Sequence, residues 1–287
     1  MSTHFFKHLK ITLEMIKFEH TVFALPFALL SAILASNGWP QGSKLLWILA
    51  AMIGARSAAM TFNRIADWPI DAANPRTRMR ALPAGLLSRS FAVLFTLASS
   101  LLFILAASQL NRLCLWLAFP VLFILLFYSY TKRFTSYSHI VLGICLGMAP
   151  LGAWIAIRGD VGLPSILLCV IVTLWTAGFD IIYSCQDTEF DRARSLFSIP
   201  KRFGVQAALR ISTGLHLLML LFLLVLLRIE KLGWISLLGA AVVAGLLYYE
   251  HSLVRPNDLS RVNAAFFTVN GYISILLLIA IGLDKLI

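Results

Sequence analysis

Long apolar runs separated by short polar stretches dominate the chain. Nine runs are candidates for membrane spans, at residues 20–37, 44–62, 90–108, 112–130, 138–157, 163–185, 208–228, 232–249 and 263–284. A helix needs about 20 apolar residues to cross the hydrocarbon core of a bilayer, whereas the strands of a membrane barrel alternate over about ten. The pattern therefore predicts an all-α polytopic membrane bundle of nine transmembrane helices, forming a single domain over residues 1–287.

The composition agrees with a lipid environment. Charged residues make up 13% of the chain and hydrophobic residues 60%, whereas soluble domains carry about 25% charged residues. The net charge of +11 comes from Lys and Arg residues between the apolar runs. We therefore interpret it as a topology signal, and expect no nucleic-acid partner.

The distribution of these basic residues predicts an orientation. If the N-terminus is cytoplasmic, 17 of the 24 Lys and Arg residues fall on the cytoplasmic side and six on the other, while Arg56 lies inside the second run. Cytoplasmic loops of membrane proteins are enriched in Lys and Arg. We expect the N-terminus in the cytoplasm and, after nine spans, the C-terminus outside.

The first of two acidic motifs follows the second apolar run. Asn63, Asp67 and Asp71 are spaced by four, which places them on one face of a helix. Arg56 lies seven residues before Asn63 on the same stripe. Pro69 can end or kink this helix, or be tolerated where a helix break lines a cavity.

The second acidic motif follows the sixth apolar run. Asp180, Ser184, Asp187 and Asp191 are separated by four, three and four residues, which again predicts one helical face. The two short stretches hold six of the thirteen acidic residues. Such carboxylates repel one another unless a cation offsets them, and Mg²⁺ prefers oxygen ligands that it shares with substrate phosphates.

Basic residues are interleaved with these acids, and Arg and Lys are good partners of phosphate oxygens. The sequence therefore predicts a site for a metal-bound diphosphate on the cytoplasmic side. The alternative is a set of solvated surface charges, which we prefer for Glu189, Arg78, Arg89 and Arg192. His139 and His216 have no metal-ligand spacing, and we expect structural roles for them.

These residues resemble the UbiA superfamily of intramembrane aromatic prenyltransferases. The shared motifs are NxxxDxxxD, at Asn63, Asp67 and Asp71, and DxxxD, at Asp187 and Asp191. The flanking segments that begin at Asn74, Leu82, Tyr128 and Gly178 also look like the family. Arg64 replaces an Asp found in many members. That pattern resembles a bacterial branch grouped with 4-hydroxybenzoate polyprenyltransferases, part of which serves menaquinone synthesis by the futalosine route.

The resemblance implies an enzyme, a Mg²⁺-dependent polyprenyltransferase of respiratory quinone synthesis. Its substrates would be a polyprenyl diphosphate and an aromatic acid acceptor such as 4-hydroxybenzoate. It would lie in the lipid bilayer of a bacterial inner membrane, with its active site facing the cytoplasm. The acceptor 1,4-dihydroxy-6-naphthoate is an alternative.

The resemblance also implies roles for single residues. Asn63, Asp67 and Asp71 would bind one Mg²⁺, and Asp187 and Asp191 a second. Asp180 or Asp67 would remove the proton from the acceptor ring. Together with Asp187 of the second motif, they are the candidate catalytic residues. The candidate substrate-binding residues are Arg56, Arg76, Lys132, Tyr128 and Tyr183.

Three of these assignments have alternatives. Arg56 lies inside a span, where charges are costly and usually functional. The resemblance suggests that it holds the acceptor carboxylate, while pairing with Asp67 or Asp180 is the structural alternative. Tyr128 and Tyr183 would line the diphosphate pocket, or are ordinary core or interfacial aromatics.

Proteins of other classes fit the pattern less well. A secondary transporter of an anionic solute places its charges near the bilayer midplane, whereas these acids cluster at one membrane face. A non-catalytic scaffold has no need of aligned metal ligands. The dense DGxxAR pattern of CDP-alcohol phosphotransferases is absent from the sequence.

Overall fold

The structure is a computed structural model that describes residues 2–17 and 21–287. Every regular element in this part of the chain is helical, apart from an isolated bridge between Arg255 and Asp258. Eight helical stretches are long and apolar enough to cross a membrane. They are α3 (Gly42–Ala66), α5 (Arg89–Leu110), α6 (Arg112–Thr131), α7 (Ser138–Arg158), α8 (Leu163–Ser184) continued by η2 (Cys185–Asp187) and α9 (Thr188–Ala193), α11 (Val205–Ile229), α12 (Trp234–Ser252), and η3 (Ala264–Val269) continued by α13 (Asn270–Leu286).

A ninth apolar helix, α2 (Thr21–Ser36), is shorter than these. Each of the nine predicted spans corresponds to one of these nine helices in the described part of the chain, and the all-α membrane fold is confirmed. The first predicted span began at residue 20, which lies outside the described residues. The remaining helices are α1 (Ser2–Met15), α4 (Trp68–Ala73) and α10 (Ile199–Phe203).

Local side-chain chemistry sets several helix ends. α5 begins after Ser88, whose hydroxyl accepts the N–H of Phe91 at 3.1 Å. α6 begins after Asn111, whose side-chain oxygen accepts the N–H of Cys114 at 2.8 Å. Both are N-cap bonds, which satisfy backbone donors that a helix leaves without partners. α7 ends at Gly159, whose φ of 77° is the left-handed conformation that glycine adopts without strain.

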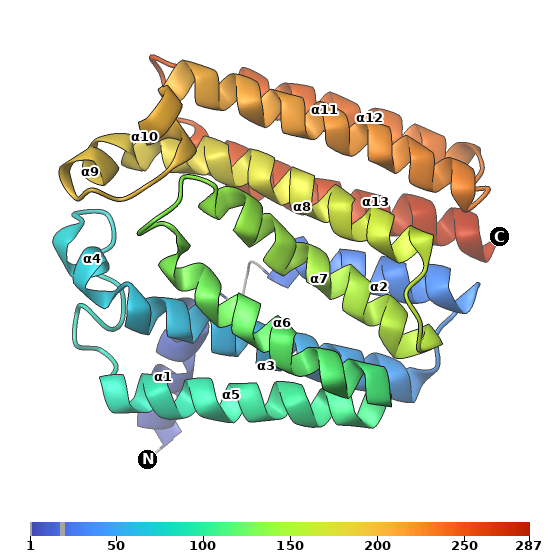
Figure 1. The fold of residues 1–287 in the computed structure, drawn as a ribbon, viewed down its shortest axis with the longest axis horizontal. Coiled ribbons are helices and arrows are strands. Elements are labelled where there is room, and N and C mark those ends of the chain that lie inside the picture. Colours follow the sequence, from blue (N-terminus) through green and yellow to red (C-terminus); the bar gives the residue numbers. More distant parts are fainter. Residues whose placement is uncertain (1, 18–20) are drawn as a thin grey trace. The chain divides into compact units, whose positions relative to one another are not determined.

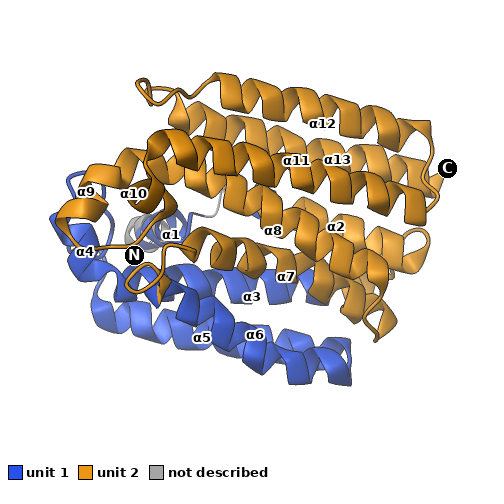
Figure 2. Ribbon diagram, turned by 45° about the horizontal axis from the view of Figure 1, so that its top comes forward, with its two compact units in different colours: residues 1–21, 46–130 blue, residues 22–45, 131–287 orange. Residues whose placement is uncertain are grey.

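The chain forms two compact units (Figure 2). Unit 1 comprises residues 1–21 and 46–130, and unit 2 comprises residues 22–45 and 131–287. Unit 1 holds α1, most of α3, α4, α5 and nearly all of α6. Within it, a buried apolar cluster joins the end of α1 to the loop after α4 and the start of α5, through Met15, Ile16, Ala81, Leu82, Leu87 and Ala92.

Unit 2 is built around α8, the most buried of the long helices. α8 packs against α7 and against α11, and the three run side by side in Figure 1. α12 packs against α11 and α13. The largest side chain in the core is Trp175 of α8, which is fully buried and contacts the rings of Phe23, Phe27 and Phe179.

Two glycines let α7 and α8 approach backbone to backbone. A Cβ atom at Gly143 would overlap the carbonyl of Thr173, and one at Gly147 would lie 2.5 Å from the carbonyl oxygen of Cys169. Small residues four apart allow this kind of contact between membrane helices, where dispersion and not water drives association. The contact places the start of α7 next to the end of α8.

Candidate active site

The first motif keeps its helical spacing across a break in the helix. Asn63 lies in the last turn of α3, Asp67 lies between α3 and α4, and Asp71 lies in α4. The N–H of Asp67 donates to Asn63 O at 2.9 Å, and the N–H of Asp71 donates to Asp67 O at 2.8 Å. Pro69 is in the first turn of α4, where a missing N–H costs nothing. The three side chains therefore stay on one stripe.

Two arginines lie beside Asp71, at the end of this stripe. Arg80 donates to both oxygens of the buried Asp71, at 2.8 and 2.9 Å. Nη1 of Arg64 lies 4.0 Å from Asp71 Oδ2, and its Nε donates to Met15 O at 3.3 Å. The side chain of Asn63 donates to Asp67 Oδ2 at 3.1 Å. Arg64, the residue at which the motif departs from the family pattern, is thus buried beside Asp71.

The other predicted residues of unit 1 lie around this cluster or after it. Arg56 is on α3, and its Nη2 donates to the carbonyl of Lys17, just beyond α1, at 2.7 Å. Tyr128 of α6 lies close enough to Arg64 for an electrostatic interaction. Arg76 is exposed on the loop after α4, and its backbone N–H donates to the Asn74 side chain at 2.9 Å.

The second motif departs from the single helix that its spacing predicts. Asp180 lies in α8, Asp187 ends the 3-10 turn η2, and Asp191 lies in α9. Side chains compete with the backbone at this turn: Ser184 Oγ donates to Ile181 O at 2.8 Å, and Thr188 Oγ1 donates to Cys185 O at 2.8 Å. Such local bonds favour a change of helix type.

The acids of the second motif nevertheless have charged and polar neighbours of the expected kind. Asp187 is near enough to Asp191 for the two negative charges to repel each other, and Lys132 is near enough to attract Asp191. Ser198 Oγ donates to Asp191 Oδ2 at 2.7 Å. A ring nitrogen of His139, Nδ1, lies 2.7 Å from Asp180 Oδ2. Unit 2 thus gathers the second set of predicted acids around one lysine and one histidine.

Tyr183 belongs to an aromatic cluster of unit 2. Its ring centroid lies 4.3 Å from that of Phe266 in the π-helical turn η3, and Phe266 in turn contacts Phe179 and Phe23. These contacts are those of a core aromatic, and the predicted contact of Tyr183 with substrate stays a prediction.

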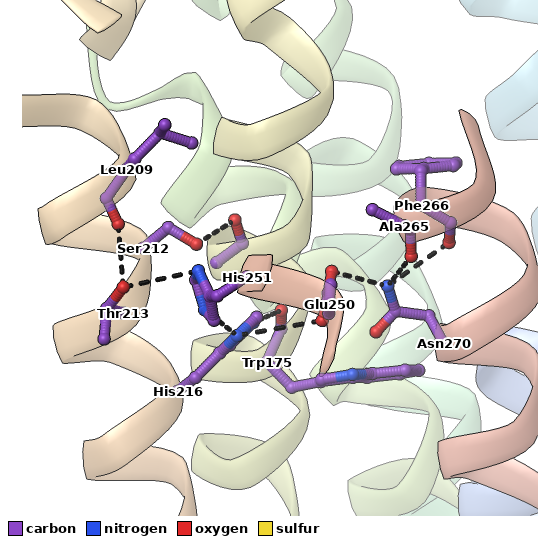
Figure 3. Close-up of polar contacts among 11 residues, drawn as sticks. Trp175, Leu209, Ser212, Thr213, His216, Glu250, His251, Ala265, Phe266 and Asn270 are labelled. Carbon is purple, nitrogen blue, oxygen red and sulfur yellow. Dashed lines mark hydrogen bonds and ion pairs between the residues drawn. The ribbon is translucent and has the colours of Figure 1, made fainter. Parts of the chain in front are cut away.

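A further polar cluster lies in the core of unit 2 (Figure 3). His216 Nδ1 lies 3.0 Å from His251 Nε2 and 3.9 Å from Glu250 Oε2, and His216 Nε2 lies 3.2 Å from Trp175 O. Glu250 Oε1 accepts from the side chain of Asn270 at 2.9 Å. Ionisable groups inside a membrane bundle require such partners, and for His216 the contacts agree with the structural role expected from the sequence.

The donor set suits Mg²⁺ in its chemistry. Asn63 and the four acids of the two motifs offer hard oxygen ligands, and the repulsion between Asp187 and Asp191 favours a cation beside them. Among the described residues, no three His, Cys, Asp or Glu side chains converge as a complete metal site. Mg²⁺ in phosphate-binding enzymes is usually held by one or two carboxylates plus the substrate itself, so the arrangement fits an ion that binds together with a diphosphate.

Comparison with known proteins identifies the family. A model of the UbiA prenyltransferase family matches residues 24–272. The chain belongs to the UbiA prenyltransferase family. The match includes residues of both compact units.

Two curated relatives of this UbiA member carry the same description. A 4-hydroxybenzoate octaprenyltransferase of Methylobacillus flagellatus is 32% identical over 237 residues, covering 83% of this chain and 80% of the relative. A 4-hydroxybenzoate octaprenyltransferase of Nitrosospira multiformis is 30% identical over 254 residues, covering 88% of this chain and 87% of the relative.

Solved structures share the UbiA fold. The apo structure of a UbiA homologue from Aeropyrum pernix K1 matches with a TM-score of 0.84 at 34% identity, covering 93% of this chain and 98% of that one. A UbiA homologue from Archaeoglobus fulgidus bound to DMAPP and Mg²⁺ matches with a TM-score of 0.74 at 19% identity, over 96% and 98% of the two chains. This second likeness shows the fold alone.

Sequence reasoning did not pair the acids with the residues that hold them in place. Arg80 lies nine residues from Asp71 in an irregular loop, and His139 lies 41 residues from Asp180 on another helix. Neither separation has a local periodicity that could reveal the contact. Ser198 offered a weak signal, since Ser before Ile-Pro is typical of a helix N-cap.

Proposed function

We propose that this protein transfers a polyprenyl group from a polyprenyl diphosphate to the ring of an aromatic acid, 4-hydroxybenzoate or a close analogue, in respiratory quinone synthesis. Membership of the UbiA prenyltransferase family and the description of the relatives support the reaction. The observation that carries the proposal is the second acidic cluster, where Asp187 and Asp191 lie together with Lys132 close by. Paired carboxylates suit a divalent cation, and lysine suits phosphate oxygens.

In this proposal, Asn63, Asp67 and Asp71 hold one Mg²⁺, and Asp187 and Asp191 hold a second. Bound Mg²⁺ would supply the positive charge that stabilises a leaving diphosphate. Asp71 accepts from Arg80 in the structure; its remaining lone pairs would serve Mg²⁺, and Arg80 would also suit nearby diphosphate oxygens. Lys132 and Arg76 bind further diphosphate oxygens.

The bond changes assign a task to the remaining residues. The allylic C–O bond of the donor breaks and its electron pair stays with the diphosphate. A ring carbon of the acceptor then forms the new C–C bond, and the proton on that carbon goes to a carboxylate. We assign this proton to Asp180, because Asp180 is partly exposed whereas Asp67 is buried with its oxygen bonded to Asn63.

Arg56 is the candidate for binding the acceptor carboxylate. Its Nη2 donates to Lys17 O at 2.7 Å. This bond anchors the side chain from a second element, and a fixed guanidinium suits a planar carboxylate. We assign Tyr128 to the same substrate pocket, which its proximity to Arg64 supports.

We propose further that the protein lies in a bacterial inner membrane and that the motifs face the cytoplasm. The basic bias of the segments between spans supports this orientation. The family match supports one functional domain, because it runs from residue 24 to residue 272.

The decisive experiment is a prenyl transfer assay in membranes that contain the full chain. Radiolabelled 4-hydroxybenzoate and 1,4-dihydroxy-6-naphthoate are each offered with a polyprenyl diphosphate and Mg²⁺. We expect product from 4-hydroxybenzoate, its loss on chelation, and its recovery when Mg²⁺ is restored. Asp67→Ala should lower the rate by at least about 100-fold, since it removes charge stabilisation of the departing diphosphate.

Glu189→Ala is the matched control, because Glu189 is an exposed acid of α9 beside the second motif. It should retain the wild-type rate. Product from the naphthoate alone would show that the acceptor is the naphthoate and would leave the proposed prenyl transfer unchanged. No product from either acid, or an Asp67→Ala rate equal to that of the control, would contradict the proposal.

A further inference from the structure

One short segment, residues 196–201, forms hydrogen bonds with three residues near the second motif. The N–H of Phe197 donates to Lys132 O at 2.7 Å. Ser198 Oγ donates to Asp191 Oδ2 at 2.7 Å. The N–H of Ile199 donates to His139 Nε2 at 3.4 Å.

The segment is itself fixed by its own bonds. Ser198 is the N-cap of α10 and accepts the N–H of Lys201 at 3.3 Å, while Lys201 Nζ donates to Leu196 O at 2.5 Å. Ser198, Ile199 and Pro200 are buried. A capped, buried turn of this kind holds its outward N–H groups in constant directions.

The bond from Ile199 decides which nitrogen of His139 carries the proton. A ring nitrogen that accepts an N–H must offer its lone pair, so Nε2 is unprotonated and the proton of a neutral ring lies on Nδ1. Nδ1 lies 2.7 Å from Asp180 Oδ2, and therefore donates to that carboxylate. His139 is 4% exposed, so little water competes for the bond.

We infer that His139 is a positioning residue that fixes the carboxylate of Asp180, and that segment 196–201 holds His139 from its far side. The same segment fixes Asp191 through Ser198. This inference rests on the proposed function, because it gives Asp180 the proton of the acceptor ring. With Oδ2 held by His139, the carboxylate would keep one orientation, and Oδ1 would be left to accept the proton.

Two amide substitutions separate the nitrogens of the ring. His139→Asn places an amide near the position of Nδ1, and so keeps a donor for Asp180. His139→Gln places its amide near the position of Nε2, and keeps a partner for Ile199 only. If positioning of Asp180 is the role, kcat should fall about 10- to 100-fold in His139→Gln and less than about tenfold in His139→Asn, in the range typical of residues that orient a functional group. The KM for polyprenyl diphosphate should change little in either variant.

His216 provides the matched control. It is as buried as His139, and its ring contacts Trp175 O and His251 instead of a carboxylate of the site. Its Asn and Gln variants should lower the unfolding temperature without differing in kcat. An order reversed at position 139, with Gln at least as active as Asn, would overturn the inference, as would equal kcat values for the two.

A spectroscopic measurement tests the same point without activity. In the full chain with ¹⁵N-labelled histidine, the His139 resonance, assigned by its loss in His139→Asn, should show a proton on Nδ1. A resonance with Nδ1 unprotonated would overturn the inference even in an active enzyme. A wild-type protein that transfers no prenyl group would contradict the proposed function alone, and the Nδ1 proton would still report the contact with Asp180.

Discussion

At the scale of single residues, the acids of each motif have partners from their own compact unit. Asp71 is 3% exposed, and Nη1 of Arg80 donates to both of its oxygens. Asp191 and Asp180 are held by a hydroxyl and an imidazole instead. The first motif thus has an arginine on a buried carboxylate, while in the second an imidazole and a hydroxyl contact two of the carboxylates.

Removal of Arg80 tests the importance of that pair. Arg80→Ala should lower the free energy of unfolding by about 1–3 kcal/mol, because it leaves a buried carboxylate with one arginine at ion-pair distance. Arg80→Lys should recover part of the loss, since lysine keeps the positive charge and an N–H donor but on a shorter, non-planar head group. Thermal unfolding in a lipid nanodisc measures both variants.

Arg78→Ala is the control, because Arg78 is an exposed arginine of the same loop. If Arg80→Ala and Arg78→Ala have the same unfolding temperature, the contact of Arg80 with Asp71 does not stabilise the fold.

Residue identities were easier to predict than residue partners. Asn63, Asp67 and Asp71 could be grouped because a spacing of four is a property of a helix, and it persists across the break before α4. His139 could not be paired with Asp180, because the contact arises from the packing of α7 on α8. Gly143 and Gly147 permit that packing, but their spacing of four does not indicate which helix they contact.

At the scale of elements, the π-helical turn η3 is held by one side chain. Asn270 Nδ2 donates to Ala265 O at 3.0 Å and to Phe266 O at 3.2 Å, and also to Glu250 Oε1 at 2.9 Å (Figure 3). A π turn leaves carbonyls without their usual partners, and Asn270 supplies a donor to two of them. The turn presents Phe266 to Tyr183.

Asn270→Ala should therefore destabilise unit 2. Loss of these bonds in a site that is 0% exposed should cost about 1–3 kcal/mol in the free energy of unfolding. Glu250→Gln should cost less, because its amide oxygen still accepts from Asn270. Unfolding curves in the same membrane mimic give both values.

The control is Asn263→Ala, since Asn263 is exposed at the start of η3 and makes no side-chain cap bond. Equal unfolding temperatures for Asn270→Ala and Asn263→Ala would contradict the role given to Asn270.

At the scale of the whole molecule, lipid is the dominant constraint on the sequence. Backbone groups in a bilayer must be satisfied within the helix, so apolar length alone predicts the spans, and the nine runs correspond to α2, α3, α5, α6, α7, α8, α11, α12 and α13. The break of α8 at η2 was not predictable in this way. It coincides with bonds from the side chains of Ser184, Cys185 and Thr188 to nearby backbone carbonyls, which compete with the regular helical bonds.

Orientation is the prediction that belongs to this scale. A phosphatase reporter fused after Ile287 should be active in the periplasm, and one inserted near Thr135, between α6 and α7, should be inactive, because an odd number of spans separates the termini. A fluorescent protein that folds only in the cytoplasm should give the opposite pattern at both positions. An active phosphatase near Thr135 with an inactive one after Ile287 would reverse the predicted orientation, and equal activity at the two positions would contradict the odd number of spans between them.

The close contact of α7 and α8 at Gly143 and Gly147 also fixes the register of the two helices. A shift of α7 by one residue along α8 would bring Leu142 or Ile144 to a place that has no room for a single methyl group. Sliding is thereby blocked, and with it any drift of His139 along Asp180. The distance between the side chains of His139 and Asp180 therefore depends on backbone contacts between α7 and α8. Substitutions on the lipid-facing surface can accumulate without altering it.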